Sequence, residues 1–182
     1  NELLLGMLAS SSEDAQALGG EWLTSVAPYV CAQPDLIARL AFISQATSQA
    51  AIRTLFSRHA LTRFLQKDVT ARIISALLSL SEDDADSASF ASELLQQIAP
   101  DELPSLPQEH LAELAAHPLE RLQLLSVTIL LRQDRASSLP EALLLAPLSS
   151  DFDSVRRLGL ELLGTLSSSQ LGQRAETLAA CA

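Results

Sequence analysis

Two histidines and a glutamate in the middle of the chain have a spacing that could hold a metal ion. His110, Glu113 and His117 lie at positions i, i+3 and i+7, so a helix would present their side chains on one face. Imidazole and carboxylate groups are ligands that Zn²⁺ prefers in proteins. No third His or Cys ligand is predicted nearby, and Pro118 follows His117 directly. We therefore interpret the three residues as the polar face of a short surface helix, and we predict neither a metal nor another cofactor.

A second candidate site is a basic segment that covers residues 53–72. It holds five Lys and Arg residues and a single acid, Asp68, whereas residues 73–120 contain ten acids and no Lys or Arg. The charge is therefore predicted to be segregated along the fold. His59, Arg63 and Lys67 follow one another at steps of four, which would align them as one exposed ridge of a helix.

This basic segment predicts either a binding surface or an ordinary solvated helix face. Runs of charge are usually solvated faces, but a basic ridge could bind an acidic segment of a partner protein, or a phosphate group. If the ridge binds a partner, the residues predicted to do so are Arg53, Arg58, His59, Arg63 and Lys67.

The sequence lacks the patterns on which common catalytic sites depend. It contains no Gly-x-Ser-x-Gly, no Gly-rich phosphate loop and no His-Glu-x-x-His. The many serines cluster where helices are predicted to begin, and helix capping explains them. Trp22 and Tyr29, at positions i and i+7, are predicted to lie in the core rather than to form a ligand site. We predict that the protein is not an enzyme.

The overall charge and the cysteines limit the partners and the compartment. A net charge of −10 disfavours non-specific binding to nucleic acid or to acidic membranes. No apolar run reaches the ~18 residues of a membrane span, and no signal peptide is recognisable. Cys31 and Cys181 lie near opposite ends, which favours two free thiols in a reducing compartment. These features predict an intracellular, cytoplasmic protein without membrane contact, and they leave a nuclear location open.

The composition predicts an all-α fold. The 182 residues are 48% hydrophobic but only 4% aromatic, and Leu, Ala and Ser dominate, which favours helices over strands. The length suits one core of ordinary size or a stack of four to five helical repeats. Periodicity and stop signals predict helices at residues 10–30, 34–43, 49–66 (bent near 57–60), 68–78, 87–99, 108–117, 118–132, 141–148, 151–166 and 168–181.

One helical pattern, a polar residue followed four positions later by Arg, recurs along the chain. It is found at Asp35 and Arg39, Asp68 and Arg72, His117 and Arg121, and Asp153 and Arg157. The first and the last of the three intervals between these pairs are in the mid-thirties, and the middle one is longer. Apolar residues follow in phase, so equivalent buried positions are predicted for Leu36, Val69, Leu119 and Val155. With a second helix between each pair, a period in the mid-thirties predicts an α-solenoid.

The long interval is interpreted as an irregular repeat at residues 82–118. It contains an acidic loop at residues 82–86 and a proline-containing linker at residues 100–107. Neither segment is expected to bury apolar surface, so both are predicted to be mobile. Capping boxes are predicted to begin at Ser105 and Ser138. Residues 1–9 are similar to the second half of the 151–169 helix, so we interpret residues 1–182 as a single domain cut from a longer protein.

The repeated pattern resembles HEAT repeats, of the armadillo/HEAT type. The resemblance is carried by Asp153-Ser154-Val155-Arg156-Arg157 and by Asp68-Val69-Thr70-Ala71-Arg72. It implies a right-handed α-solenoid of about four to five helical hairpins. It also implies a ladder of Asp and Arg residues that bridges successive repeats, in which we expect Arg72 and Arg157 to take part. His117-Pro118 replaces the Asp of the third unit, so one rung is expected to be missing.

A helical stack of this kind presents a large surface for its mass and no pocket that demands chemistry. We therefore predict a non-catalytic scaffold that binds another protein. The alternative is a nucleic-acid-associated HEAT-like module that uses residues 53–72. That mode needs several convergent Lys and Arg residues and is disfavoured by the net charge of −10.

Overall fold

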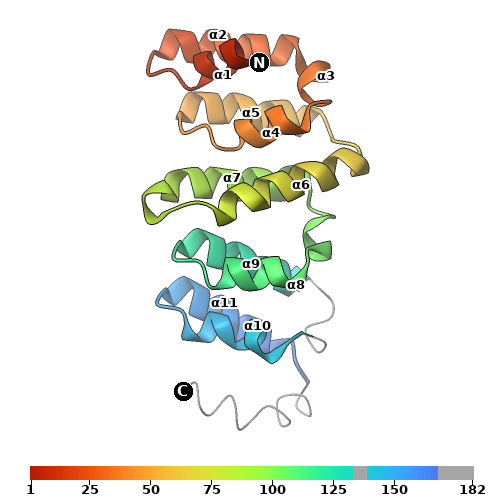
Figure 1. The fold of residues 1–182 in the computed structure, drawn as a ribbon, viewed down its shortest axis with the longest axis vertical. Helices are drawn as coiled ribbons and strands as arrows, with labels where there is room; N and C mark the ends of the chain where they lie inside the picture. The colour runs from red at the N-terminus through yellow and green to blue at the C-terminus, as the bar shows by residue number, and fades with distance from the viewer. Residues whose placement is uncertain (133–138, 168–182) are drawn as a thin grey trace. The chain divides into compact units, whose positions relative to one another are not determined.

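A computed structural model describes residues 1–132 and 139–167 of the chain. Within these ranges it contains eleven α-helices, three short 3₁₀ helices and no β-strand (Figure 1), which confirms the predicted all-α class. The chain divides into two compact units, of which the first is Asn1–Leu103 and the second begins at Pro104. The boundary between them lies within the predicted linker at residues 100–107.

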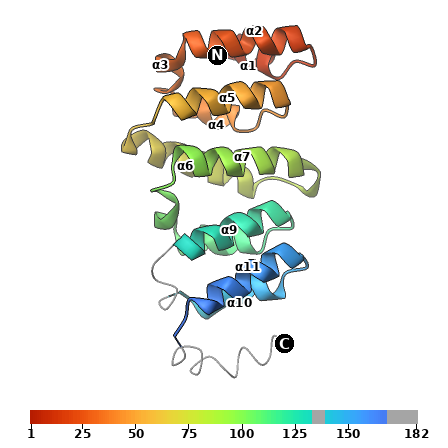
Figure 2. The same cartoon turned by 180° about the vertical axis from the view of Figure 1, so that it is seen from behind.

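The first unit contains seven helices, six of which form two layers. They are α1 (Glu2–Leu8), α2 (Glu13–Ser25), α3 (Ala27–Val30), α4 (Pro34–Leu40), α5 (Ala46–Arg58), α6 (Arg63–Leu78) and α7 (Ala85–Ile98), with the 3₁₀ turn η1 (Glu82–Asp84) before α7. α1 packs against α2, and α6 against α7, as helical hairpins. α4 also packs on α6, while α5 packs on both α2 and α7. One layer therefore holds α1, α4 and α6, and the other holds α2, α5 and α7 (Figures 1 and 2).

Aliphatic side chains form most of the core of this unit. The largest fully buried side chains are Leu8, Leu23, Leu36, Ile37, Leu40, Ile52, Ile73, Ile74, Leu77, Phe90, Leu94 and Leu95. They recur at helical spacing, so each helix turns one apolar stripe inward. Burial of one such side chain contributes about 1.5–3 kcal/mol relative to exposure. The stripes predicted from the sequence therefore supply the main favourable term in the folding of the unit.

Two successive hairpins of the first unit, α1–α2 and α4–α5, repeat one another along the sequence. α2 runs from Glu13 to Ser25, and α5 runs from Ala46 to Arg58. The number of residues from the start of α2 to the start of α5 therefore equals the number from the end of α2 to the end of α5. We name this spacing, which also separates Asp35 from Asp68, the hairpin offset. It is therefore the interval predicted from the first two Asp–Arg pairs.

A side-chain hydrogen bond recurs at the hairpin offset. The Nε2 atom of Gln16 donates a hydrogen bond to the carbonyl of Ser10 at 2.8 Å. At the equivalent position, Nε2 of Gln49 donates to the carbonyl of Ile43 at 2.9 Å. In each hairpin a Gln near the start of the second helix thus holds the loop that leads into it.

The second unit has two helical hairpins in its described part. They are α8 (Gln108–Ala115) with α9 (Glu120–Arg132), and α10 (Glu141–Leu145) and η4 (Ala146–Ser149) with α11 (Asp153–Gly164). α9 packs on α11, and α8 packs on α10. The buried hydroxyl of Ser126 donates to the carbonyl of Leu111 at 2.8 Å and joins α9 to α8. Gly159 lets α11 approach η4, because a Cβ atom at this position would lie 2.8 Å from the Cβ atom of Pro147.

The predicted repeat register holds in the first unit and is wrong across the two units. Asp35 and Asp68 lie on α4 and α6, the first helices of their hairpins, whereas α9 and α11 are second helices. The four residues predicted to share one position are all buried, but they occupy two kinds of position: Leu36, Val69, Leu119 and Val155. The predicted similarity of residues 1–9 to the 151–169 helix also needs correction. Glu2 precedes Asp35 by the hairpin offset, and α1 is the first helix of a hairpin, whereas α11 is a second helix.

Two predicted helix boundaries are wrong. The bent helix predicted at residues 49–66 is not one helix, because α5 ends at Arg58 and a new helix, α6, begins at Arg63. α6 continues to Leu78, so the break predicted between residues 66 and 68 is absent. The capping box at Ser105 does not form, since Pro107 is the N-cap of α8 and no side chain caps that helix. The predictions for Ser138, for the helix at residues 168–181 and for Cys181 lie outside the described residues.

The two segments predicted to be mobile both carry defined structure. The carboxylate of Asp84 accepts hydrogen bonds from the backbone N–H and the hydroxyl of Ser81 at 3.0 and 2.8 Å, and these bonds cap η1. They lower the pKa of Asp84 below its ordinary value, because they stabilise the ionised carboxylate. In the linker, Leu103 is fully buried. The prediction that neither segment buries apolar surface is therefore wrong for the linker.

Candidate functional site

The predicted basic ridge lies at the junction between α5 and α6, and its helical alignment is wrong. His59 follows the last residue of α5 with extended backbone angles (φ −128°, ψ 95°), and α6 starts only at Arg63. His59 therefore lies off both helices and does not continue the line of Arg63 and Lys67. All three residues are exposed, as is Arg58 at the end of α5.

Arg53 is engaged within the protein. Its Nη2 atom lies 2.9 Å from Oε2 of Glu93, and its guanidinium lies 4.9 Å from the centre of the Phe90 ring. Its backbone carbonyl accepts a hydrogen bond from Nε2 of Gln97 at 3.1 Å. All three partners belong to α7, so Arg53 holds α5 against α7 by an ion pair, a cation–π contact and a backbone hydrogen bond.

Arg63 also has an acidic partner, because its Nε atom lies 3.2 Å from Oε1 of Glu102. Both Glu102 and Glu93, the partner of Arg53, come from residues 73–120, the stretch that contains only acids. These two acids therefore lie against the basic segment. The predicted segregation of charge along the fold is therefore wrong at these two pairs.

The start of α6 extends beyond the helix that packs beside it. Asp35 is the second residue of α4, whereas Asp68, at the corresponding position, is the sixth residue of α6. α6 is thus longer at its N-terminus by about one turn, which adds roughly 6 Å of helix. Figures 1 and 2 show these first turns projecting past the ends of α4 and α5.

Phe64 lies in this projecting part and is 81% exposed, more than any other large hydrophobic side chain in the described part of the chain. In the sequence it stands at helical spacing with two other apolar residues, Leu61 and Leu65, but it does not share their burial. Leu61 is buried and Leu65 is partly buried. Lys67 follows Phe64 by three positions on α6, so both side chains lie on one side of the helix.

We name the group formed by Arg58, His59, Phe64 and Lys67 the α6 tip. Within the described residues, Arg58, His59 and Lys67 form no ion pair with an acid. Two cations and an imidazole can bind carboxylate or phosphate groups, and the ring of Phe64 offers an apolar contact.

Arg72 forms the bridge between helices that the sequence predicts. Its Nη1 atom lies 2.5 Å from Oδ1 of Asp35 on α4, and its Nε atom lies 3.0 Å from Oδ1 of Asp68 on its own helix. One hairpin earlier, Arg39 contacts Glu2 at 2.5 Å. The hydrogen bonds and the charge of Arg39 lower the pKa of Glu2 below its ordinary value. Each bridge joins residues 37 positions apart, so the two bridges are equivalent.

The bridging role predicted for Arg157 is wrong. Arg157 is exposed and has no ion-pair partner in the part of the chain that the structure describes. Asp153 pairs instead with Arg156, whose guanidinium also donates to the carbonyl of Ser150. In α11 the ion pair of Asp153 is therefore made by the Arg three positions later, Arg156, and not by Arg157. The contacts of Arg156 that the structure describes are all at the start of α11 and do not reach another helix.

His117 has a local structural role. It lies beyond the end of α8, and its Nδ1 atom accepts a hydrogen bond from the backbone N–H of Leu119 at 3.2 Å. Its ring thus stabilises the turn that leads into α9. His110 and Glu113 remain on α8, so the three residues do not share one helical face as predicted. Over residues 1–132 and 139–167, no group of three His, Cys, Asp or Glu side chains could hold a metal ion.

Two aromatic residues predicted to lie in the core are at the surface. Trp22 and Tyr29 are both exposed, so this prediction is wrong. Cys31 is a partly buried free thiol, and its burial raises the pKa of the thiol. Among the helices that the structure describes, none is both long enough and apolar enough to cross a membrane.

Comparisons with known protein families, with curated proteins and with solved structures found no match to this chain. The candidate site is therefore defined by its own geometry. Of the predicted site residues, the structure leaves Arg58, His59 and Lys67 without an acidic partner in the described ranges and adds Phe64. A signal for Phe64 was present in the sequence, because alignment of Asp68 with Asp35 leaves the first turn of α6 without a counterpart in α4.

Proposed function

We propose that this chain is a non-catalytic interaction module that binds an acidic segment of another protein at the α6 tip. The observation that supports this most is the 81% exposure of Phe64, in a short stretch of chain that also contains the exposed side chains of Arg58, His59 and Lys67. An aromatic side chain on a projecting helix end contributes little to the packing of its own unit. Aromatic and Arg side chains are enriched where proteins bind one another.

The scaffold that we propose is an α-solenoid of about four to five HEAT-like hairpins. Its support is the hairpin offset shared by the first two hairpins, together with the equivalent bridges of Arg39 to Glu2 and Arg72 to Asp35. In such a stack each hairpin contacts only its neighbours. A helix longer than its neighbour then exposes its extra residues, and the start of α6 is such a segment.

The partner segment that suits the α6 tip combines carboxylates with an apolar side chain. Arg58 and Lys67 would bind the carboxylates, and the ring of Phe64 would cover a Leu or Phe side chain of the partner. Exposed ion pairs alone contribute only about 0–1 kcal/mol each. The apolar contact at Phe64 therefore has to supply much of the affinity.

Nucleic-acid binding is the less favoured alternative. Arg53, Arg63 and Arg72 each contact an acid within the protein, which leaves Arg58 and Lys67 as the cations of the tip. Tight duplex binding uses many phosphate contacts. The net charge of −10 further opposes approach to a polyanion.

An NMR titration with a short peptide of alternating Asp and Leu residues tests the proposal. We expect chemical-shift changes concentrated in residues 58–67. Phe64→Ala should weaken binding by roughly tenfold, because it removes a side chain worth about 1.5 kcal/mol or more when buried. Leu3→Ala is the matched control, since Leu3 is also largely exposed but lies in a stretch, residues 1–38, that contains no Lys or Arg.

Three outcomes would contradict the proposal. The first is equal binding of a peptide in which Lys replaces Asp, since the tip would then not select acids. The second is binding that Phe64→Ala leaves unchanged. The third is preferential binding of a short DNA duplex with a steep salt dependence, which would favour the nucleic-acid alternative.

A further inference from the structure

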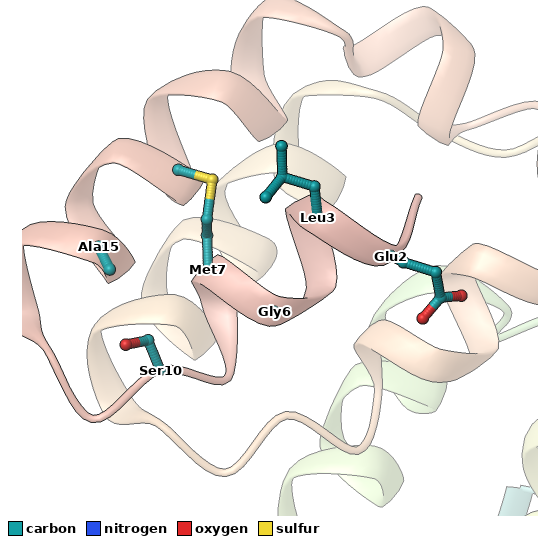
Figure 3. A pocket seen from close by; sticks show the side chains of 6 residues that line it. All are labelled: Glu2, Leu3, Gly6, Met7, Ser10 and Ala15. Atoms are coloured by element: carbon teal, nitrogen blue, oxygen red, sulfur yellow. The ribbon is translucent and has the colours of Figure 1, made fainter.

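A second exposed apolar surface lies on the first hairpin, α1–α2. Leu3, Leu18 and Trp22 are 67%, 57% and 38% exposed. An open hollow of about 590 Å³, to which Leu3 also belongs, is lined by Glu2, Leu3, Gly6, Met7, Ser10 and Ala15. In Figure 3 the side chains of Leu3 and Met7 lie next to each other along α1, and Glu2 points away from them.

The apolar residues of the two helices form one surface. Ala15, Leu18 and Trp22 lie at i, i+3 and i+7, so they form one stripe along α2. Ala15 also lines the hollow with Leu3 and Met7, so the stripe adjoins the exposed side of α1. We name the surface made by Leu3, Met7, Leu18 and Trp22 the N-terminal face.

The next hairpin, α4–α5, shows what covers such a surface. The equivalent bridges of Arg39 to Glu2 and Arg72 to Asp35 extend the hairpin offset to α1 and α4. By this offset, Leu3, Met7 and Trp22 correspond to three fully or almost fully buried side chains, which are Leu36, Leu40 and Leu55. The apolar types are thus kept, while the exposure differs. The same face is therefore covered in the second hairpin and open in the first.

Two contacts identify α1–α2 as the cover in the second hairpin. Ser48, which corresponds to Ala15, is buried and donates its hydroxyl to the carbonyl of Leu8 at 2.8 Å. Ala51, which corresponds to Leu18, packs against Gly20, where a Cβ atom would lie 3.2 Å from the Cβ atom of Ala51. A helical element therefore fits the face in its equivalent position.

The charges around the N-terminal face restrict the kind of helix that it accepts. Residues 1–38 contain no Lys or Arg. Asp14 and Glu21 are exposed on α2, four positions before Leu18 and three after it, so they flank the apolar stripe. A second copy of the chain docked by the same face would bring these acids together. A helix with basic flanks would instead place opposite charges opposite one another.

We propose that the N-terminal face binds an amphipathic helix of another protein, with an apolar stripe flanked by Lys or Arg. This interaction is separate from the one at the α6 tip, which takes an acidic segment. The two surfaces thus select partners of opposite charge.

The chain carries its own probes for this interaction, because Trp22 is its single Trp and Met7 its single Met. The test adds a helical peptide of about 18 Leu and Lys residues, about five turns long, with Leu on one face. We expect the fluorescence of Trp22 to shift to the blue, its quenching by acrylamide to fall, and the methyl NMR signal of Met7 to move. A Leu/Glu peptide of the same pattern should cause none of these changes, and added salt should weaken the effect of the Leu/Lys peptide.

Leu18→Glu should weaken binding of the Leu/Lys peptide at least tenfold, although it adds a negative charge that favours non-specific attraction. Leu160→Glu makes the same change at a Leu on α11 that is 62% exposed, and it should leave the affinity unchanged. Circular dichroism checks that both variants remain folded. Leu18→Ala is the milder variant should Leu18→Glu unfold, and it should weaken binding in the same direction.

Four results would overturn the proposal. Equal responses to the two peptides would show unspecific apolar adsorption, and equal losses in the Leu18 and Leu160 variants would show attraction to the whole protein. A blue shift that grows with protein concentration in the absence of peptide, with a dimer mass, would make a second copy the occupant. A Trp22 that is already protected, and that neither peptide nor dilution affects, would show that the chain covers the face itself.

Discussion

Replacement of Arg72 by Ala should destabilise the first unit, because this side chain joins two helices. Arg72 contacts Asp35 on α4 at 2.5 Å and Asp68 on α6 at 3.0 Å, and its side chain is 42% exposed. The change removes both ion pairs together. It also leaves the carboxylates of Asp35 and Asp68 facing the same space without a cation between them.

The magnitude follows from the two pairs. The pair with Asp68 is an i,i+4 pair within a helix and contributes about 0.3–0.5 kcal/mol. The pair with Asp35 connects two helices at a partly exposed position, for which about 0.2–1 kcal/mol is typical. The expected loss is therefore about 1 kcal/mol. For a chain of this length, such a loss lowers the melting temperature by roughly 2–4 °C.

Arg157→Ala is the matched control, because Arg157 also follows an Asp by four positions on a helix but has no ion-pair partner in the described residues. Urea unfolding of both variants should be followed by circular dichroism in dilute buffer and in about 1 M NaCl, where the screening length falls to about 3 Å. We expect Arg72→Ala to lose about 1 kcal/mol in dilute buffer and clearly less at high salt. Arg157→Ala should remain near the unchanged protein in both.

Two results would refute this reasoning. Equal losses for the two variants would show that the contacts of Arg72 carry no particular stability. A loss at Arg72 that high salt leaves unchanged would assign the effect to packing of its aliphatic stem rather than to its charge.

Two further changes test the packing and the electrostatics. Gly159→Ala should cost about 1–3 kcal/mol in urea unfolding, because the added Cβ atom would lie 2.8 Å from that of Pro147. Gly164→Ala in the same helix meets no atom within 4 Å, so it should not destabilise, and a loss there as large as at Gly159 would contradict the steric explanation. The pKa of Glu2 is held below its ordinary value of 4.5 by Arg39, so its contribution to stability is full above that value and disappears as pH falls through the lowered pKa. Glu2→Gln should therefore flatten the fall of the unfolding free energy as the pH drops below about 4.5, and an unchanged pH dependence in this range would show that the pair adds no stability.

Most of what the sequence predicts correctly depends on short-range patterns. Apolar spacing and composition identify an all-helical fold, because each stripe is a property of one helix. The interval between Asp35 and Asp68 gives the hairpin offset, since α2 and α5 have the same length and are separated by that interval along the chain. The bridge of Arg72 to Asp35 is predictable for the same reason. Asp35 and Asp68 are separated by the hairpin offset, so they lie at corresponding positions on the neighbouring helices α4 and α6.

The layer to which a helix belongs could not be predicted from the same pattern. An acid followed four positions later by Arg stabilises a helix wherever that helix lies. Asp68 uses this pattern in a first helix, and Asp153 begins a second helix with the same sequence signal. The pattern therefore indicates a helix and carries no information on the layer, and at Asp68 it does not mark the start, because α6 begins at Arg63. Only the order of hairpins, counted from the loops between them, distinguishes the two cases.

The size of the candidate site was overestimated because ion pairs between distant residues are invisible to local patterns. Arg53 and Arg63 find Glu93 and Glu102 some forty positions later in the chain. Those acids appear in the sequence as a separate acidic stretch. In the folded chain they pair with Arg53 and Arg63 of the basic segment. Of the predicted Lys and Arg residues of the site, only Arg58 and Lys67 therefore remain in the α6 tip.

Because Arg53 and Arg63 are paired within the protein, only two cations of the α6 tip can bind a partner, and the apolar contact at Phe64 gains weight in the specificity of the tip. Two phosphate contacts, one each from Arg58 and Lys67, would give duplex binding a salt slope of only about −1.8, far from the slope of about −10 that strong duplex binders reach. Two exposed carboxylate pairs would add about 2 kcal/mol at most. Burial of a Phe ring contributes about as much as both pairs together and is not screened by salt. If the tip binds an acidic and apolar segment, loss of Phe64 should therefore weaken binding more than loss of either cation. A phosphate site would show the reverse order.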